Sequence, residues 1–389
     1  PMALIISKKQ STTDVGNRCT DVDIGIRKKT DGKFSTYQQH IIQNISVFKE
    51  KKKTYNNFYA MVKKEWTTQG YIDEPAPAGT DLSAEIRKMC EQKKAVILAH
   101  YYTRGEIQDV ADFIGDSLAL ARKAAETDAR IIVMCGVHFM AETCKILSPD
   151  KKVLAPDLNA GCSLADSCRA DDLRKFKDEH PGYKVVSYVN TTAAVKALTD
   201  VVVTSGNAKK IVDSFPKDEK LIFGPDRNLG AYINSVTGRQ MLLWEGGCHV
   251  HERFSVAEVV KLRQAHPGAK VLAHLECKGP VLALADVVGS TAVMLEYVKK
   301  SADKEFIVAT EAGILHEMKR SCPDKTFLPV PPEISEGSLG CSCNECDYMK
   351  MNTMLKLYNA LKYEWPVVDV DPEVAREAVK PIERMLSLS

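Results

Sequence analysis

The sequence has 389 residues, with 53 basic and 51 acidic side chains and a formal net charge of +2, so no strong field points to nucleic acid or anionic lipid. Its apolar runs are too short to cross a bilayer, and its first residues do not resemble a secretory signal. We therefore expect a cytoplasmic protein of two or three domains, whose twelve cysteines serve metal or redox chemistry more than structural disulfides.

Residues 1–78 differ in composition from the rest of the chain. They are polar, contain the basic run Lys51–Lys53 and show no clear hydrophobic period. We predict a poorly ordered or non-native N-terminal extension over 1–78, in which residues 1–60 could be a translated upstream region. The ordered domain is expected to begin near Asp81, which can cap the helix that follows it.

Three later segments share one order of elements: strand, helix, strand, helix, strand. The first strand of each ends at a polar residue, and a serine lies 17, 15 and 16 positions further on, at a helix start. The pairs are His100 with Ser117, Asn190 with Ser205, and His274 with Ser290, which Thr291 follows. Short apolar strands alternating with helices indicate parallel sheets covered on both faces. We therefore predict an α/β fold of three similar three-layer αβα units.

The repeat also suggests where the units begin and end. We predict a first unit of 79–152 together with 325–389, a second of 153–238 and a third of 239–324. Ligands of such folds bind beyond the carboxyl ends of the strands. Pseudo-threefold symmetry between the units would turn these ends toward one central active site.

The repeated serines have two interpretations. A serine at a helix start is commonly an N-cap. Helix N-termini also bind anions through free N–H groups and the helix dipole. Because the position recurs at the predicted ligand end of every unit, we favour contact with an anionic substrate.

A segment with cysteine follows each unit. Cys162 and Cys248 directly follow glycine, and the third segment holds Cys341, Cys343 and Cys346. Three thiolates gathered near one axis would hold a metal centre and leave one position open for water or substrate, whereas four would close it. Spacing alone does not decide which cysteine of the trio is the ligand, and we favour Cys346.

Zinc is the main competing metal. Cys343-x-x-Cys346 resembles half of a zinc ribbon, but no second CxxC completes it. The pair could also be a surface pair that oxidises, with Cys343 in a regulatory disulfide with Cys346 or Cys341.

Short, uncommon sequence motifs occur in order over about residues 80–389, and together they make the chain resemble the quinolinate synthase (NadA) family. They are Ala99-His-Tyr-Tyr-Thr103, Gly115-Asp-Ser-Leu118, Phe139-Met-Ala-Glu-Thr143, Cys162-Ser-Leu164, Tyr188-Val-Asn-Thr191, Gly224-Pro-Asp226, Trp244-Glu-Gly-Gly-Cys248, Gly289-Ser-Thr291 and Cys343-Asn-Glu-Cys-Asp-Tyr. The resemblance implies three α/β units and a [4Fe–4S] cluster with three ligands, Cys162, Cys248 and Cys346, and one open iron. It also implies a transferase of de novo NAD biosynthesis that condenses iminoaspartate with dihydroxyacetone phosphate, giving quinolinate, phosphate and water.

The same resemblance assigns the site residues. It places catalytic roles on Glu276, Tyr102, His100 and His251. It places substrate contacts on His100, Ser117, Tyr188, Asn190, Ser205, His274, Glu276, Ser290 and Thr291. The open iron would act as a Lewis acid, with Glu276 and Tyr102 transferring protons.

One departure from the family pattern concerns the loop that carries Glu276. The family usually has His-Pro-Glu where this chain has His274-Leu275-Glu276. Without proline the backbone loses a φ restraint and gains an N–H, so we expect a less rigid loop.

Two other classes of protein remain open. A non-catalytic iron–sulfur sensor or electron carrier would use the same cysteines without a reaction of its own, and a zinc-dependent α/β hydrolase would be colourless. For the enzyme we expect two small anionic substrates and transient contact with the enzyme that produces iminoaspartate. We expect no nucleic acid and no membrane among its partners.

Overall fold

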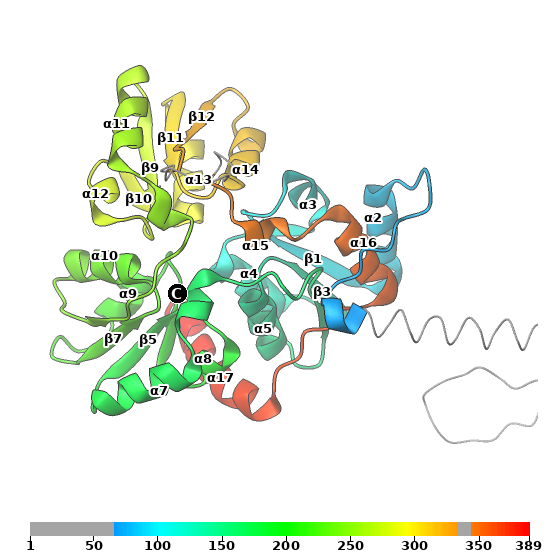
Figure 1. Ribbon diagram of the computed structural model, residues 1–389, viewed down its shortest axis with the longest axis horizontal. Coiled ribbons are helices and arrows are strands. Elements are labelled where there is room, and N and C mark those ends of the chain that lie inside the picture. The colour runs from blue at the N-terminus through cyan, green and yellow to red at the C-terminus, as the bar shows by residue number, and fades with distance from the viewer. Residues whose placement is uncertain (1–65, 333–343) are drawn as a thin grey trace, which may run out of the picture. The chain divides into compact units, whose positions relative to one another are not determined.

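The computed structural model describes residues 66–332 and 344–389 (Figure 1). Most of the predicted extension, residues 1–65, therefore lies outside the described residues, as do Cys341 and Cys343. In the part of the chain that is described, no helix is both long and apolar enough to cross a membrane.

Three parallel sheets of four strands form the frame of the fold. Their strand orders are β2-β1-β3-β4, β6-β5-β7-β8 and β10-β9-β11-β12, so the same topology occurs three times. The strands of the first sheet are β1 (Ala95–His100), β2 (Phe113–Gly115), β3 (Ile131–Cys135) and β4 (Lys152–Leu154). Those of the second are β5 (Lys184–Tyr188), β6 (Val201–Val203), β7 (Leu221–Gly224) and β8 (Leu242–Leu243). Those of the third are β9 (Lys270–His274), β10 (Val287–Gly289), β11 (Glu305–Ala309) and β12 (Thr326–Pro329). This arrangement confirms the predicted α/β class with three similar parallel-sheet units.

Helices connect and cover these sheets. They are α2 (Leu82–Lys93), α3 (Gly105–Val110), α4 (Ser117–Glu126), α5 (His138–Leu147), α6 (Ser163–Ser167), α7 (Ala170–Glu179), α8 (Ala193–Lys196), α9 (Ala208–Asp213), α10 (Arg227–Thr237), α11 (Val256–Ala265), α12 (Gly279–Leu282), α13 (Thr291–Lys300), α14 (Ile314–Ser321), α15 (Asp347–Lys350), α16 (Met354–Tyr363) and α17 (Pro372–Leu388), with a 3₁₀ turn, η1 (His251–Arg253).

An aspartate occupies the same place in each unit and joins its first two strands. The carboxylates of Asp112, Asp200 and Asp286 each accept the N–H of a residue fifteen positions earlier, at 2.7, 2.8 and 2.8 Å. Each aspartate's own N–H donates back to the carbonyl of that same residue. The same two hydrogen bonds at the same separation show that the units repeat at the level of single contacts.

The strand register corrects the sequence alignment of the units. His100 pairs with Gly115, Tyr188 with Val203, and His274 with Gly289, each as the last pair of its two strands. Tyr188, and not Asn190, is therefore the second-unit counterpart of His100 and His274. The sequence pattern extended this strand too far, because Val189 and Asn190 continue its apolar and polar alternation.

Each sheet also has a fourth strand, whereas the sequence pattern predicted three strands in each unit. The fourth strands lie at or beyond residues 152, 238 and 324, where the sequence pattern ended the units, and β8 has only two residues. The C-terminal segment is shared as well: α16 packs against α2, whereas α17 packs against α8 and β6 of the second unit.

The residues just before α2 are attached to the fold. The ring of Trp66 packs against Tyr363 at 4.7 Å between centroids, and Ile72 is buried. The side chain of Asn359 donates to the carbonyl of Ile72. The described structure thus starts ahead of Asp81, whose carboxylate caps α2 as expected.

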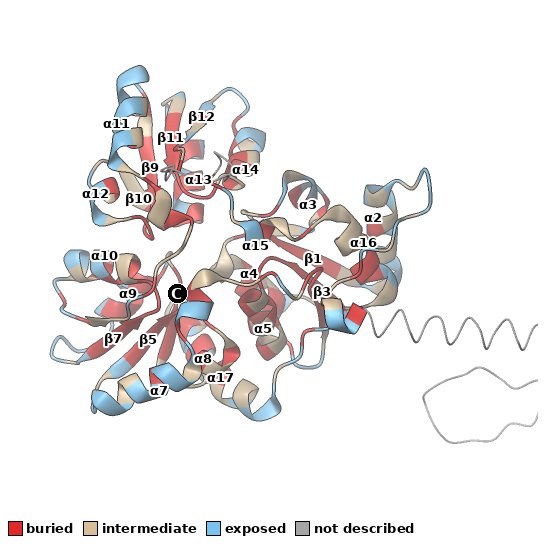
Figure 2. Cartoon of the chain, viewed as in Figure 1, coloured by how far each residue is buried: buried red, intermediate tan, exposed pale blue. Residues whose placement is uncertain are grey.

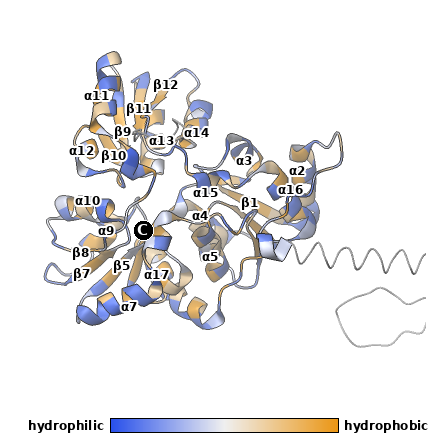
Figure 3. Ribbon diagram, viewed as in Figure 1, coloured by the Kyte–Doolittle hydropathy of each residue, from blue (hydrophilic) through white to orange (hydrophobic). Residues whose placement is uncertain are grey.

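Burial follows the sheets. Figure 2 shows the strands buried while outer helices such as α7 and α11 expose one face, and Figure 3 shows the same strands as the most hydrophobic segments. All residues of β6 are buried, as are those of β3, so these sheets are covered on both faces.

Candidate active site and metal centre

One cavity receives residues from all three units. It encloses about 710 Å³ of space not filled by atoms, including solvent at its mouth. Every predicted site residue except Ser290 lines it: His100, Tyr102, Ser117, Cys162, Tyr188, Asn190, Ser205, Cys248, His251, His274, Glu276, Thr291 and Cys346. The carboxyl ends of the strands therefore meet at a shared site.

The serines predicted at helix starts were interpreted either as N-caps or as contacts for an anionic substrate, and the structure separates the two cases. The Ser290 hydroxyl accepts the N–H of Val293 and is the N-cap of α13. Asp116 caps α4, which leaves Ser117 one position inside that helix. With the observed registers, Ser117, Ser205 and Thr291 each lie 17 residues after the end of the first strand. Thr291, rather than Ser290, is therefore the equivalent of the two cavity-lining serines.

These helix starts lie close together around Gly206. A Cβ built on Gly206 would lie 3.6 Å from the hydroxyl of Ser290 and 3.9 Å from the carboxylate of Asp116. Burial raises the pKa of Asp116 above its ordinary value. The three units therefore meet at the side of the cavity where the helices begin.

Each of the three cavity cysteines precedes a short helical turn. Cys162 is the N-cap of α6, Cys346 is the N-cap of α15, and Cys248 lies just ahead of η1. Burial raises the pKa of Cys162 to about 12 and that of Cys346 to about 11, although adjacent backbone N–H groups act in the opposite direction. Burial also raises the pKa of Cys248 well above its usual value. A bound metal cation would reverse this balance, because it stabilises the thiolate form.

The loops that carry the cysteines are joined to one another by the residues beside them. The N–H of His249 donates to the hydroxyl of Ser163, and its Nδ1 lies 3.0 Å from the same oxygen. The His249 ring packs edge-on against Tyr348, and a Cβ on Gly161 would lie 3.4 Å from the Tyr348 ring. These contacts hold the three thiol-bearing loops around one point. Ser163 and Tyr348 lie in the motifs quoted above and His249 directly follows one of them, but the sequence gave no sign of this role.

Glu276 is the most heavily contacted ionisable group of the cavity. Its Oε1 accepts the hydroxyl proton of Tyr188 at 2.6 Å, and its Oε2 lies 3.2 Å from Nδ1 of His251. Its Oε1 also lies 3.5 Å from Nδ1 of His274. Burial opposes ionisation, but His251 and the hydrogen bonds to the carboxylate outweigh it, and the pKa of Glu276 lies below its ordinary value.

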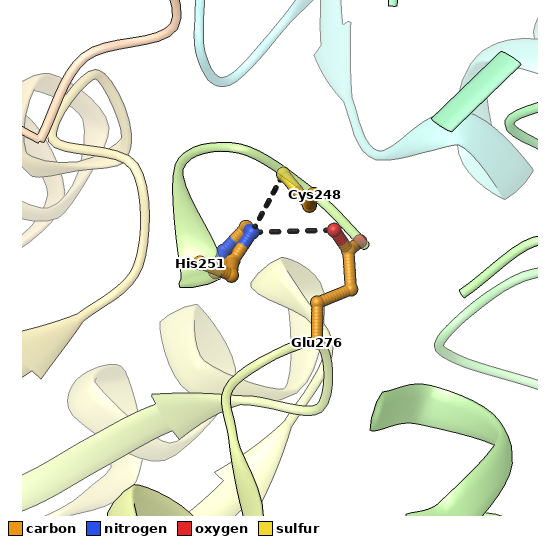
Figure 4. A group of neighbouring side chains, drawn as sticks. All are labelled: Cys248, His251 and Glu276. Atoms are coloured by element: carbon orange, nitrogen blue, oxygen red, sulfur yellow. Dashed lines mark hydrogen bonds and ion pairs between the residues drawn. The ribbon is translucent and has the colours of Figure 1, made fainter. Parts of the chain in front are cut away.

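The ligand atoms of Cys248, His251 and Glu276 lie within 4.8 Å of one another, a spacing compatible with a metal ion. Figure 4 shows the three side chains facing one another, with the His251 ring in contact with both Cys248 and Glu276. His251 Nδ1 lies 3.2 Å from the sulfur of Cys248 as well as near Glu276. One ring nitrogen is thus shared between a thiol and the carboxylate.

The other nitrogen of His251 continues this contact chain to Tyr102. His251 Nε2 lies 2.9 Å from the hydroxyl of Thr310, which lies 2.7 Å from the hydroxyl of Tyr102. Sequence analysis did not identify Thr310. Its one usable signal was its position directly after β11, at the carboxyl end of a parallel strand.

Two histidines at strand ends present hydrogen-bond donors to the cavity. Burial lowers the pKa of His100 to about 3 and that of His274 to about 4, so both are neutral near pH 7. The N–H of Tyr102 donates to His100 Nδ1, and the N–H of Glu276 faces His274 Nδ1 at 3.4 Å. Because Nδ1 accepts in each ring, Nε2 carries the proton.

Asn190 adds an acceptor without a partner. Its side-chain Oδ1 is buried and has no hydrogen-bond partner among the described residues, and Asn190 lines the cavity. A buried acceptor left unsatisfied is costly, so a ligand that donates to it would be stabilised.

Leu275, which replaces the usual proline, is buried in the main apolar core. The turn around it is closed by a 2.9 Å hydrogen bond from the N–H of Cys277 to the carbonyl of His274. Packing and this hydrogen bond therefore restrain the loop in place of the proline ring.

Comparison with known proteins places this site in a family. The family model described as Quinolinate synthetase A protein (NadA) matches residues 84–387. The quinolinate synthase of Nostoc sp. is 51% identical over 316 residues, covering 81% of this chain and 96% of that protein. The quinolinate synthase of Chloroherpeton thalassium is 52% identical over 309 residues, covering 79% and 95%, and that of Prochlorococcus marinus is 53% identical over 305 residues, covering 78% and 89%. The match spans all three sheets and every residue of the cavity, and the chain belongs to the quinolinate synthetase A family.

Proposed function

We propose that the protein is a quinolinate synthase of NAD biosynthesis, which condenses iminoaspartate with dihydroxyacetone phosphate and releases phosphate and water. The observation that carries the proposal is that three thiols from three loops line the same cavity as the Glu276–His251–Tyr102 network. A carrier of electrons would need the thiols but not the network.

The donor set fits a [4Fe–4S] cluster held by Cys162, Cys248 and Cys346. The three thiols line one cavity, are partly buried and lie beside backbone N–H groups, which stabilise thiolates. When bound, a cluster with three protein ligands supplies an iron that acts as a Lewis acid toward substrate oxygen.

The substrates are small anions, and the cavity offers several donors for them. Ser117 and Thr291 are the first residues of α4 and α13, where the peptide dipoles favour negative charge, and Ser205 lies in the turn that precedes α9. His100 and His274, neutral with Nε2 protonated, can donate to carboxylate or phosphate oxygens. Tyr188 and Asn190 complete the second-unit side of the site.

Glu276 is the proposed general base. Its carboxylate is ionised and aligned by Tyr188 and His251, so it can accept a proton from a bound substrate. Tyr102 is the proposed acid, since it lines the cavity and its hydroxyl contacts Thr310 at the end of the network; burial raises its pKa, so the hydroxyl is protonated near pH 7. His251 and Thr310 join the two groups, so a proton taken up at Glu276 can be returned at Tyr102.

We further propose that the reaction takes place in the cytoplasm. Iminoaspartate would pass to this protein by transient contact with the enzyme that produces it.

The test is anaerobic purification of the full chain, with iron and sulfide analysis and an assay of quinolinate formation. We expect about four irons per chain and activity, because a cubane cluster contains four irons. Cys162→Ser should lose both together. Zinc in a colourless protein, or iron without quinolinate formation, would contradict the proposal.

A further inference from the structure

Two charged side chains beside the cavity, one buried and one mostly buried, have no part in the proposed reaction. Glu311 is fully buried and lines the cavity, and Lys350 of α15 is 12% exposed. Lys350 Nζ lies 2.9 Å from Glu311 Oε1, and the exposed carboxylate of Glu345 lies 3.8 Å away from the same nitrogen. A buried ion pair contributes little net stability, because desolvation offsets the attraction. The role of the Glu311–Lys350 ion pair is therefore inferred from the groups that its two side chains contact.

The carboxylate of Glu311 holds the backbone at one cavity cysteine. Its Oε1 accepts the N–H of Cys346 at 3.0 Å, and its Oε2 accepts the N–H of Gly313 at 2.6 Å. Nearby, the N–H of Ala312 donates to the carbonyl of Asn344 at 2.9 Å. The segment with Cys346 is thus fastened to the loop that follows β11.

Lys350 binds the backbone of the first unit, in the loop that contains Tyr102 and Arg104. It donates to the carbonyl of Tyr102 at 2.8 Å, while the guanidinium of Arg104 donates to the carbonyl of Lys350 at 2.9 Å. Both Tyr102 and Arg104 lie in the loop between β1 and α3 (Figure 1). One ion pair therefore connects the segment of Cys346 with the loop of Tyr102.

Gly313 shows how closely these groups are packed. A Cβ there would lie 2.7 Å from Glu311 Oε2, 2.9 Å from Lys350 Nζ and 2.9 Å from the carbonyl carbon of Tyr102. Real side chains do not tolerate such distances to backbone, so only glycine fits between the three.

We infer that the Glu311–Lys350 ion pair is a positioning device that fixes Cys346 relative to Tyr102. This rests on the proposed function, in which Cys346 is a cluster ligand and Tyr102 a proton donor. Both Glu311 and Lys350 are positioning residues, since they act through the backbones of Cys346 and Tyr102.

Amide hydrogen exchange of the full-length Lys350→Met variant tests the connection. We expect exchange to rise about tenfold or more, as for a lost charge-assisted hydrogen bond, in two peptides at once, 101–105 and 344–352. The matched control is Lys356→Met, which removes another buried ion pair, with Asp157, but touches neither peptide. The control should leave both peptides at the wild-type rate.

The reduction potential of the cluster-loaded protein gives a second test, of the charges on Glu311 and Lys350. Glu311→Gln keeps one of the two backbone acceptors but removes the buried negative charge beside Lys350, which leaves only the exposed carboxylate of Glu345 at 3.8 Å among the described residues, so the reduction potential of the cluster should rise. Adding Lys350→Met to Glu311→Gln removes the Lys350 charge and should return the potential toward the wild-type value. A purely structural loss would not produce this reversal.

Wild-type exchange in either peptide of Lys350→Met, or an unchanged potential in Glu311→Gln, would overturn the inference. Failure of the proposed function would look different. It would appear as wild-type protein without iron or quinolinate formation, whereas the exchange comparison does not depend on iron.

Discussion

At the scale of single residues, His251 connects the chemistry of the cavity. Its Nδ1 lies near both the Cys248 sulfur and the Glu276 carboxylate, and its Nε2 reaches Thr310 and through it Tyr102. A change at Cys248 can therefore affect Tyr102 through two intervening side chains, His251 and Thr310. The least expected member of this chain is Thr310, whose hydroxyl lies between His251 and Tyr102.

Thr310→Val should slow turnover without changing the metal content. Valine has the shape of threonine but breaks the contact between His251 and Tyr102, so kcat should fall roughly ten- to a hundredfold, less than loss of a general acid or base. Thr310→Ser keeps the hydroxyl and is the control. Steady-state kinetics with iron analysis measures both. A Thr310→Val enzyme with wild-type kcat would show that protons do not pass through this residue.

At the scale of elements, one strand–helix–strand design is used three times. The aspartates at 112, 200 and 286 make the same two hydrogen bonds to the first strand of their unit. The strand ends then bring His100, Tyr188 and His274 to equivalent places, with Ser117, Ser205 and Thr291 17 residues later. The site is thus assembled from repeated positions that have diverged in residue type.

The repeated aspartates should be energetically equivalent. Asp112→Ala, Asp200→Ala and Asp286→Ala each leave a strand N–H without its acceptor, so each should lower the free energy of unfolding by about 1–3 kcal/mol. The Asn variants keep an acceptor and should cost less. Denaturant unfolding measures all six. A negligible effect at one position, beside full effects at the others, would show that its unit is not held in the same way.

The helix after β5 contains a buried lysine that should make stability depend on pH. Lys196 Nζ donates to the carbonyls of Val189 and Thr191, which flank Asn190. Burial lowers the pKa of Lys196 to about 8, from a model-compound value of 10.5. Between these values the unfolded chain binds more protons than the folded one, so a rise in pH favours folding.

Relative to Lys196→Met, the wild-type protein should therefore gain roughly 3 kcal/mol of stability as the pH rises from about 8 to about 10.5. The measurement is denaturant unfolding of both proteins across this range. An exposed lysine replaced in the same way, Lys88→Met, supplies the baseline. A flat difference between wild type and Lys196→Met would mean that the buried amine titrates normally.

The sequence predicted some of this architecture better than the rest. Cys162 and Cys248 stand out in the linear pattern because each follows glycine, whereas spacing did not separate Cys346 from Cys341 and Cys343, and Glu276 was assigned through the family resemblance. Two- and three-residue strands such as β8 and β4 carry too little periodicity to be seen. The assignments of Asn190 and Ser290 to repeat positions were wrong by two residues and one residue, since only strand pairing fixes register.

At the scale of the whole molecule, three cysteine loops, three strand ends, two helix starts and the turn before α9 face one cavity. Contacts among His249, Ser163 and Tyr348 join the cysteine loops, and the Glu311–Lys350 pair joins the last of them to the first unit. None of these contacts is local in sequence. This is why sequence patterns located the thiols but did not show what holds them together.

The central claim is that three thiols hold a cluster whose remaining iron faces the substrate cavity. The most direct test is a Mössbauer spectrum of anaerobic, ⁵⁷Fe-loaded protein with and without dihydroxyacetone phosphate. Three protein ligands predict one iron site distinct from the others, and its signal should change when substrate is added. Iron sites that are all equivalent and insensitive to substrate would contradict the account.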